Sequence, residues 1–123
     1  MTGIGYHYLY DFYECEKHIL NDIPRLGKMM VESSLASGAR IISEHSHKFE
    51  PYGVSSIIIL AESHLSLHTW PEYDFASVDL FSCNSEIDGT KAMDVLVKYL
   101  LPKNTVMQKI LRGLNIIKSP LVP

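Results

Sequence analysis

Apolar and polar residues alternate along most of the chain, which is the pattern of strands whose two faces meet different surroundings. Residues 4–13 place Tyr6, Tyr8, Tyr10 and Phe12 on one face of such a strand. The same reasoning predicts further strands over residues 40–49, 64–70, 75–83 and 105–111, and an interior strand, apolar on both faces, over residues 54–61.

Two segments repeat apolar residues at helical spacing instead. The first follows Asp22, a residue type that caps helix N-termini, has Pro24 in its first turn and ends at Gly38. The second follows Asp88 and carries an apolar stripe as far as Pro102. The sequence therefore predicts two helices separated by four strands.

The order of these elements predicts an α+β fold, a two-layer α/β sandwich in which an antiparallel β-sheet carries two helices packed on one face. The other face of the sheet must then be covered or used. Without a linker or repeat, residues 1–123 are expected to form a single domain. The tail, residues 113–123, is expected to lie on the surface or against a partner.

Composition and charge narrow the class of protein. A net charge of -3 without a basic cluster argues against nucleic acid as a partner. A membrane-spanning helix needs about 18 consecutive apolar residues, and no run in the sequence is that long. No leader-like segment opens the sequence, so a cytoplasmic protein is expected. The two cysteines do not form a disulfide framework, and both Cys15 and Cys83 are expected to be buried thiols. At 123 residues the chain is small for an enzyme that closes a cleft alone, so a partner subunit is expected.

Reactive side chains concentrate in residues 61–73, directly after the apolar strand at 54–61. This segment holds one hydroxyl nucleophile, two imidazoles, two carboxylates and the only tryptophan, namely Ser63, His64, His68, Glu62, Glu72 and Trp70. Core packing does not require such a density of polar groups. We therefore expect the chemistry of the protein to lie here.

The turns on either side of this strand fix which residues should be neighbours. A turn near residues 72 and 73 pairs Ser63 with Ser82 or Cys83, and a turn near residues 62 and 63 brings Ser55 close to His68.

His68 is five residues along the strand from Ser63, which is about 16 Å at about 3.3 Å per residue, and the odd spacing puts the two on opposite faces. One subunit cannot easily join them. A two-fold dimer resolves this if Ser55 and His68 of one protomer meet Ser63 and Cys83 of the other.

Several motifs in the sequence resemble those of the small prokaryotic class of S-adenosylmethionine decarboxylases, which are pyruvoyl-dependent enzymes of polyamine synthesis. The resemblance covers about the first hundred residues. The motifs are Gly5-Tyr-His7, Phe12-Tyr-Glu-Cys15, Phe49-Glu-Pro-Tyr-Gly-Val-Ser55, Glu62-Ser-His-Leu-Ser-Leu-His-Thr-Trp-Pro-Glu72-Tyr73 and Val78-Asp-Leu-Phe-Ser-Cys83.

The resemblance implies a proenzyme that cuts itself between Glu62 and Ser63, into a β chain of residues 1–62 and an α chain of residues 63–123. Ser63 would become the pyruvoyl cofactor, whose carbonyl forms a Schiff base with the substrate. His68 would be the proton acceptor in processing, an imidazole being suited by its pKa. No metal is implied.

Further roles follow from the resemblance alone. Ser55 would support the processing intermediate, Cys83 would be the proton donor to the substrate carbon, and Phe49 and Glu72 would bind the substrate. The implied reaction converts S-adenosylmethionine to decarboxylated S-adenosylmethionine, an aminopropyl donor, and CO2 in spermidine synthesis. A homodimer or higher oligomer with shared active sites is expected.

Four alternatives remain at this stage. Relatives of this fold decarboxylate arginine or ornithine with the same cofactor, and a non-catalytic small-molecule-binding module is also compatible with the fold. A serine hydrolase would need a nucleophile elbow and a third triad member that the sequence does not offer. A metal site would draw on histidines from different strands, namely His45, His47, His64 and His68.

Overall fold

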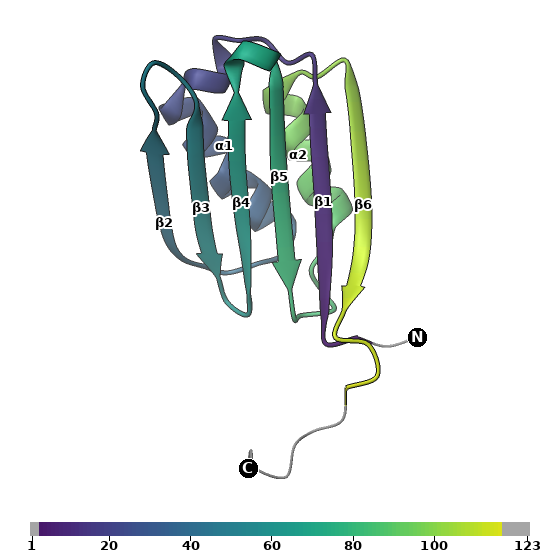
Figure 1. Cartoon of the computed structure of the whole chain (residues 1–123). Helices are drawn as coiled ribbons and strands as arrows, with labels where there is room; N and C mark the ends of the chain where they lie inside the picture. Colours follow the sequence, from purple (N-terminus) through teal and green to yellow (C-terminus); the bar gives the residue numbers. More distant parts are fainter. Residues whose placement is uncertain (1–2, 117–123) are drawn as a thin grey trace.

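The computed structural model describes residues 3–116, in which six strands form one antiparallel sheet and two helices lie on one of its faces (Figure 1). The elements follow one another as β1 (Gly5–Tyr13), the short 3-10 helix η1 (Ile19–Asn21), α1 (Ile23–Ala36), β2 (Ile41–Lys48), β3 (Val54–Leu60), β4 (Ser63–Trp70), the 3-10 helix η2 (Pro71–Tyr73), β5 (Phe75–Ser82), α2 (Gly89–Leu100) and β6 (Asn104–Arg112). The predicted fold class is confirmed. Most of the tail, residues 117–123, lies outside the described residues.

The strand order across the sheet is β2-β3-β4-β5-β1-β6, so β4 and β5 lie in the middle. Every strand begins and ends within one residue of the range that alternation predicts. Period-two patterning located β1, β4 and β5 accurately because one face of each is buried and the other is less so.

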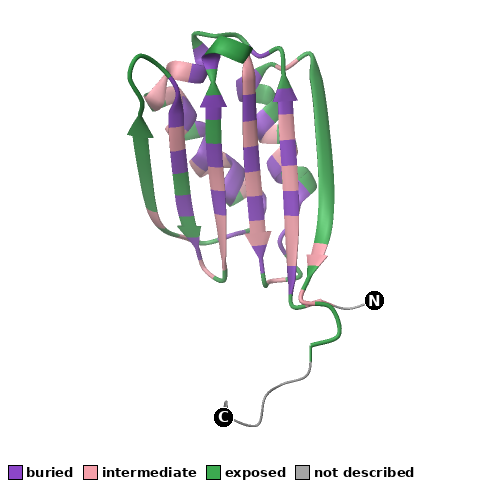
Figure 2. Cartoon of the chain, viewed as in Figure 1, coloured by how far each residue is buried: buried purple, intermediate pink, exposed green. Residues whose placement is uncertain are grey.

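The core lies between the sheet and the two helices. Along β1 the aromatic side chains of Tyr8, Tyr10 and Phe12, which alternation put on one face, are buried between the sheet and the helices. Figure 2 shows the same alternation of buried and less buried positions along the central strands. Leu65 and Leu67 continue this layer on β4. These residues supply the apolar burial that stabilises the fold.

Both helices begin at the residues predicted to cap them. The side chain of Asp22 accepts a hydrogen bond from the backbone N–H of Arg25, and Asp88 accepts from Thr90 and Lys91. Gly38, just beyond α1, has a φ of +93°, a conformation that glycine adopts without the clash of a Cβ atom. Local sequence therefore sets where the helices lie along the chain.

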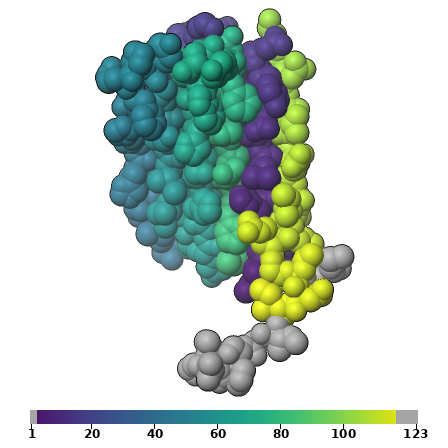
Figure 3. Space-filling model, in the orientation of Figure 1, coloured from purple at the N-terminus to yellow at the C-terminus, as the bar shows by residue number. Residues whose placement is uncertain are grey.

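The face of the sheet opposite the helices, here called the open face, is turned toward the viewer in Figures 1 and 3. Five of the six histidines lie on it, because alternation along each strand directs them away from the helices. The open face is formed by His7, Leu9, Asp11, His45, His47, Ser55, Ile57, Ile59, His64, Ser66, His68, Trp70, Phe75, Ser77, Asp79, Phe81, Val106, Gln108, Ile110 and Arg112.

Strand β3 carries isoleucines on both faces, as the sequence indicated. Ile58 is buried beneath the helices, whereas Ile57 and Ile59 are 36% and 39% exposed on the open face. Exposed isoleucines among the polar residues of the open face agree with the prediction that this surface is covered or used.

Among residues 3–116, no helix is both long enough and apolar enough to cross a membrane.

Candidate active site

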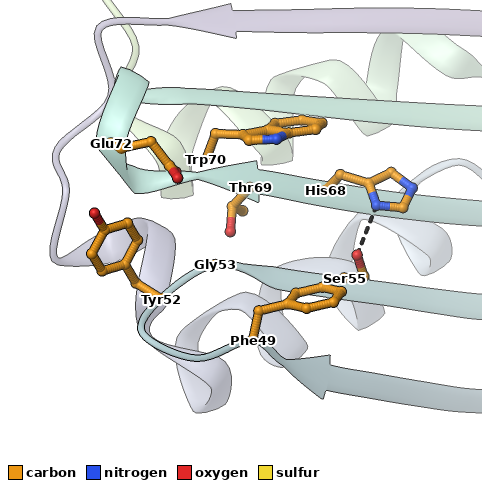
Figure 4. Close-up of a pocket in the computed structure, with 8 residues that line it drawn as sticks. All are labelled: Phe49, Tyr52, Gly53, Ser55, His68, Thr69, Trp70 and Glu72. Carbon is orange, nitrogen blue, oxygen red and sulfur yellow. Dashed lines mark hydrogen bonds between the residues drawn. The ribbon is translucent and has the colours of Figure 1, made fainter.

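A hollow of about 490 Å³ opens at the end of the sheet where β2 meets β3 and β4 meets η2 (Figure 4). Its walls come from the β2–β3 connection, the first residues of β3, the last residues of β4 and η2. The lining residues are Phe49, Tyr52, Gly53, Ser55, His68, Thr69, Trp70 and Glu72.

Ser55 and His68 face one another within this hollow. They are cross-strand partners on β3 and β4, and the Ser55 hydroxyl lies 2.8 Å from Nδ1 of His68 (Figure 4). The predicted proximity of these two residues is therefore confirmed. A hydrogen bond at Nδ1 fixes the orientation of the imidazole, which is the arrangement used to aim a general base.

Two further candidates, Phe49 and Glu72, line the same hollow. Phe49 follows β2, is 48% exposed and packs the edge of its ring against His47 at 4.7 Å between ring centroids. Glu72 lies on η2, with its side chain exposed. The structure thus gathers an exposed aromatic ring, a carboxylate and the Ser55–His68 pair in one place.

Trp70 and Tyr52 also line the hollow, although sequence reasoning gave neither a role in the site. Trp70 is 38% exposed, and its ring centroid lies 6.1 Å from that of His68. Trp70 is two residues from His68, and alternation therefore puts both side chains on the same face of the strand. This spacing could have predicted Trp70 as a residue of the site.

Ser63 and Cys83 lie at the opposite end of the central strands. Ser63 begins β4 and pairs with Ser82, the last residue of β5, as the turn geometry predicted. The backbone N–H of Cys83 donates a hydrogen bond of 3.0 Å to the carbonyl oxygen of Glu62. The expectation of a buried thiol is wrong for Cys83, which is exposed just after β5, and is confirmed for Cys15. Burial raises the pKa of the Cys15 thiol to about 11. Of the two thiols, Cys83 is the one placed to react.

The connection between β3 and β4 is a two-residue hairpin loop, Ala61 and Glu62, and its second residue is unusual. Glu62 has a φ of +63°, in the left-handed region that costs a residue with a side chain of the order of 1–3 kcal/mol. The hydroxyl of the next residue, Ser63, donates to the carbonyl oxygen of Ala61 at 2.9 Å. A strained peptide and a serine thus adjoin at the predicted cut.

One chain does not bring the two groups together. Ser63 and His68 occupy the two ends of β4, about 16 Å apart at about 3.3 Å per residue. The two side chains also belong to opposite faces of the sheet. Ser63 is two residues from the buried Leu65 and shares its face, whereas His68 lies on the open face. The prediction that one protomer cannot join them agrees with this geometry.

A second cluster lies on the open face at the Ser63 end of the sheet, where the imidazoles of His7 and His64 pack against the ring of Phe81 and Arg112 bonds His7. Nδ1 of His7 accepts a hydrogen bond of 3.1 Å from the Arg112 guanidinium. The neutral ring then carries its proton on Nε2, which is buried and has no partner within the part of the chain that the structure describes. Burial lowers the pKa of His7, Arg112 and His64 lower it further, and Asp79 opposes them.

Acidification is expected to destabilise the fold through His7. Its pKa in the folded protein is below the ordinary value of 6.5, so the unfolded chain binds more protons and stability falls as the pH drops through this range. The urea midpoint should decrease from about pH 7 to about pH 5, and it should decrease less in a His7→Gln variant. Equal pH dependence in the two proteins would contradict this assignment.

A metal centre was one of the open alternatives. Within residues 3–116, no three His, Cys, Asp or Glu side chains gather closely enough to hold a metal ion.

Comparison with known proteins identifies the family. The sequence profile of S-adenosylmethionine decarboxylases matches residues 6–113. The S-adenosylmethionine decarboxylase proenzyme of Thermosipho melanesiensis is 41% identical over 113 residues, which are 92% of this chain and 87% of that protein. The proenzyme of Caldicellulosiruptor saccharolyticus is 38% identical over 114 residues, covering 93% of this chain and 92% of that protein.

Solved structures agree. The adenosylmethionine decarboxylase of Aquifex aeolicus superimposes with a TM-score of 0.84 at 28% identity, covering 97% of this chain and 98% of that one. A monomer of the Trypanosoma brucei enzyme shares the fold, with a TM-score of 0.59 at 15% identity over 83% of this chain and 44% of that one. The resemblance seen in the motifs is therefore confirmed, and the chain belongs to the S-adenosylmethionine decarboxylase family.

Proposed function

We propose that the protein is a self-processing, pyruvoyl-dependent decarboxylase that converts S-adenosylmethionine to decarboxylated S-adenosylmethionine and CO2 for polyamine synthesis. The observation that carries this proposal is the turn at Glu62 and Ser63. There, a strained peptide precedes a serine, and the amide of Cys83 donates to the carbonyl that the serine would attack.

Processing would begin with addition of Ser63 Oγ to the carbonyl carbon of Glu62. The C–N bond between the two residues then breaks, the nitrogen of residue 63 takes up a proton, and an ester joins the chains. As negative charge develops on the Glu62 oxygen, the hydrogen bond from the Cys83 amide stabilises it. Backbone amides used in this way need no reorganisation during the step.

The second stage requires a base. Removal of the Cα proton of residue 63 breaks the bond between its Cβ and the ester oxygen, which leaves as part of the Glu62 carboxylate. The dehydroalanine that remains is converted by water to pyruvoyl and ammonia. His68 is the proposed base. If its Nδ1–H donates to the Ser55 oxygen 2.8 Å away, Nε2 carries the lone pair that accepts the proton.

A homodimer would supply His68 to Ser63. Because about 16 Å separates these residues along β4, the His68 of one chain is too far from its own Ser63 to take its proton. A second copy of the chain would supply the imidazole. The open face carries the Ser55–His68 pair amid apolar groups such as Ile57, so it suits burial against a like surface. An isologous contact of this kind would create two shared sites per dimer.

In the processed enzyme the pyruvoyl carbonyl would supply the electron sink that decarboxylation requires and that no ordinary side chain provides. The exposed Cys83 thiol, next to Ser63, is the proposed proton donor to the substrate carbon. From the partner subunit, the accessible ring of Phe49 would stack on the adenine of the substrate, and the Glu72 carboxylate would accept hydrogen bonds from the ribose hydroxyls.

Release of CO2 by the processed protein tests the proposal against the related decarboxylases. Labelled S-adenosylmethionine, arginine and ornithine should be supplied separately under the same conditions. We expect release from S-adenosylmethionine alone. Release from arginine or ornithine alone would assign the site to the alternative substrates, and release from none of the three would favour the non-catalytic alternative.

A further inference from the structure

The connection between β2 and β3 forms one wall of the hollow, because it carries Phe49 and Tyr52 (Figure 4). It closes on itself through a hydrogen bond of 2.8 Å from the Phe49 N–H to the Gly53 carbonyl. Strand β2 is the edge of the sheet, so no further strand supports this loop. Something else must therefore fix where Phe49 lies.

That support comes from η1, which precedes α1. The side chain of Asn21, the last residue of η1, accepts a hydrogen bond of 2.9 Å from the N–H of Gly53. Gly53 is buried and has a φ of +108°, and a Cβ atom there would lie 3.3 Å from the Thr69 carbonyl oxygen. The loop thus ends in a conformation that favours glycine, and its amide is satisfied by a side chain 32 residues away.

The neighbouring residue of η1 holds the other wall. Thr69 is 6% exposed, and its hydroxyl donates to the Leu20 carbonyl at 2.7 Å while accepting from the Val54 N–H at 2.8 Å. Thr69 lies between His68 and Trp70, which line the hollow. Consecutive residues of η1, Leu20 and Asn21, therefore connect the loop and strand β4.

We propose that Asn21 is a positioning residue for substrate recognition. By holding the Gly53 amide, its side chain fixes the loop that presents Phe49 to the aromatic base of the substrate. This inference rests on the proposed function, since it concerns how that same site selects an adenine nucleoside. The Asn21 side chain bonds Gly53, whereas the Ser55–His68 pair that serves processing is held by its own hydrogen bond between β3 and β4. Loss of Asn21 therefore moves the loop that carries Phe49, which weakens substrate binding and spares self-processing and the chemical step.

Two substitutions separate the hydrogen bond from the presence of a side chain. Asn21→Ala removes the acceptor, whereas Asn21→Asp keeps an oxygen that accepts from Gly53. Asn21 is half-buried at the end of a short helix, so both variants should fold. The KM for S-adenosylmethionine should rise about tenfold in Asn21→Ala and change by less than about twofold in Asn21→Asp.

The readouts distinguish positioning from general damage. The kcat of Asn21→Ala should stay within about twofold of the wild type, its cleavage into two fragments should keep the wild-type rate, and competitive inhibition by adenosine should weaken by the same factor as KM. An unchanged KM, a fall in kcat alone, unaltered inhibition by adenosine, or an Asn21→Asp variant as poor as Asn21→Ala would overturn the inference. Absence of CO2 release from the wild type would instead overturn the proposed function.

Discussion

Substitution of Ser63 by alanine is expected to leave the chain uncut and without decarboxylase activity. Alanine has no hydroxyl to attack the Glu62 carbonyl, so neither the ester nor the cofactor derived from it can form. A denaturing gel and mass spectrometry should find only the intact chain of 13.9 kDa after prolonged incubation, and CO2 release from S-adenosylmethionine should fall to background.

Ser66→Ala is the matched control for this experiment. Ser66 lies on the same strand, three residues further along, and pairs with Asp79 on the open face. The same chemical change should therefore leave cleavage into two fragments intact. A Ser63→Ala chain that is still cut at residue 62 would rule out Ser63 as the attacking group.

Ser63→Ala and His68→Ala chains, each inactive alone, should recover decarboxylase activity when they form a dimer with one another. In a heterodimer of Ser63→Ala and His68→Ala chains, one site combines the intact Ser63 of one chain with the intact His68 of the other. Random pairing makes half of the dimers mixed, with one working site of two, so co-expression should recover about one quarter of wild-type CO2 release. Each variant alone should be far below that value.

Two residues that are proposed to act from the same protomer provide the negative control. Ser63 and Cys83 lie together at one end of the sheet, through the pairing of Ser63 with Ser82. Co-expressed Ser63→Ala and Cys83→Ala chains should consequently give no recovery, because no site in their heterodimer is complete. Recovery in this pair, or none in the Ser63 and His68 pair despite heterodimers isolated with two different tags, would contradict the shared site.

The parts of the site that the sequence predicted are those set by short hairpins. A two-residue loop between β3 and β4 determines that Ser55 faces His68, and the short η2 turn determines that Ser63 faces Ser82. Once the turns are located, strand register follows from counting, since side chains alternate between the faces. Helix positions were predictable for a similar reason, because Asp22 and Asp88 cap them locally.

The parts that sequence reasoning missed depend on packing between distant segments. The bond from Gly53 to Asn21 spans 32 residues, and that from Arg112 to His7 spans 105. Neither leaves a periodic signal in the sequence. The sequence shows the Pro-Tyr-Gly turn, but it does not show which group accepts the hydrogen bond of the buried Gly53 amide. That acceptor, Asn21, is known only because the structure places η1 beside the turn.

The roles of individual residues came from the family motifs, and physical reasoning supplied their relative positions. Alternation and turn geometry separate Ser63 from His68 without reference to any relative. The motifs resemble those of a family in which both residues serve one reaction. Because the two residues lie far apart in one chain, the resemblance leads us to expect that they come from two subunits. The match over residues 6–113 shows that the chain belongs to the S-adenosylmethionine decarboxylase family, and the co-expression experiment tests the proposed roles of Ser63 and His68.

The origin of the reactive carbonyl can be measured directly. The purified protein should be incubated with S-adenosylmethionine and cyanoborohydride, which makes a bond between an amine and a carbonyl permanent, and then analysed by mass spectrometry. We predict fragments of residues 1–62 and 63–123, with the substrate-derived mass on the second fragment, at residue 63. A single intact chain without added mass, or substrate attached to the first fragment, would contradict the proposal that Ser63 becomes the cofactor.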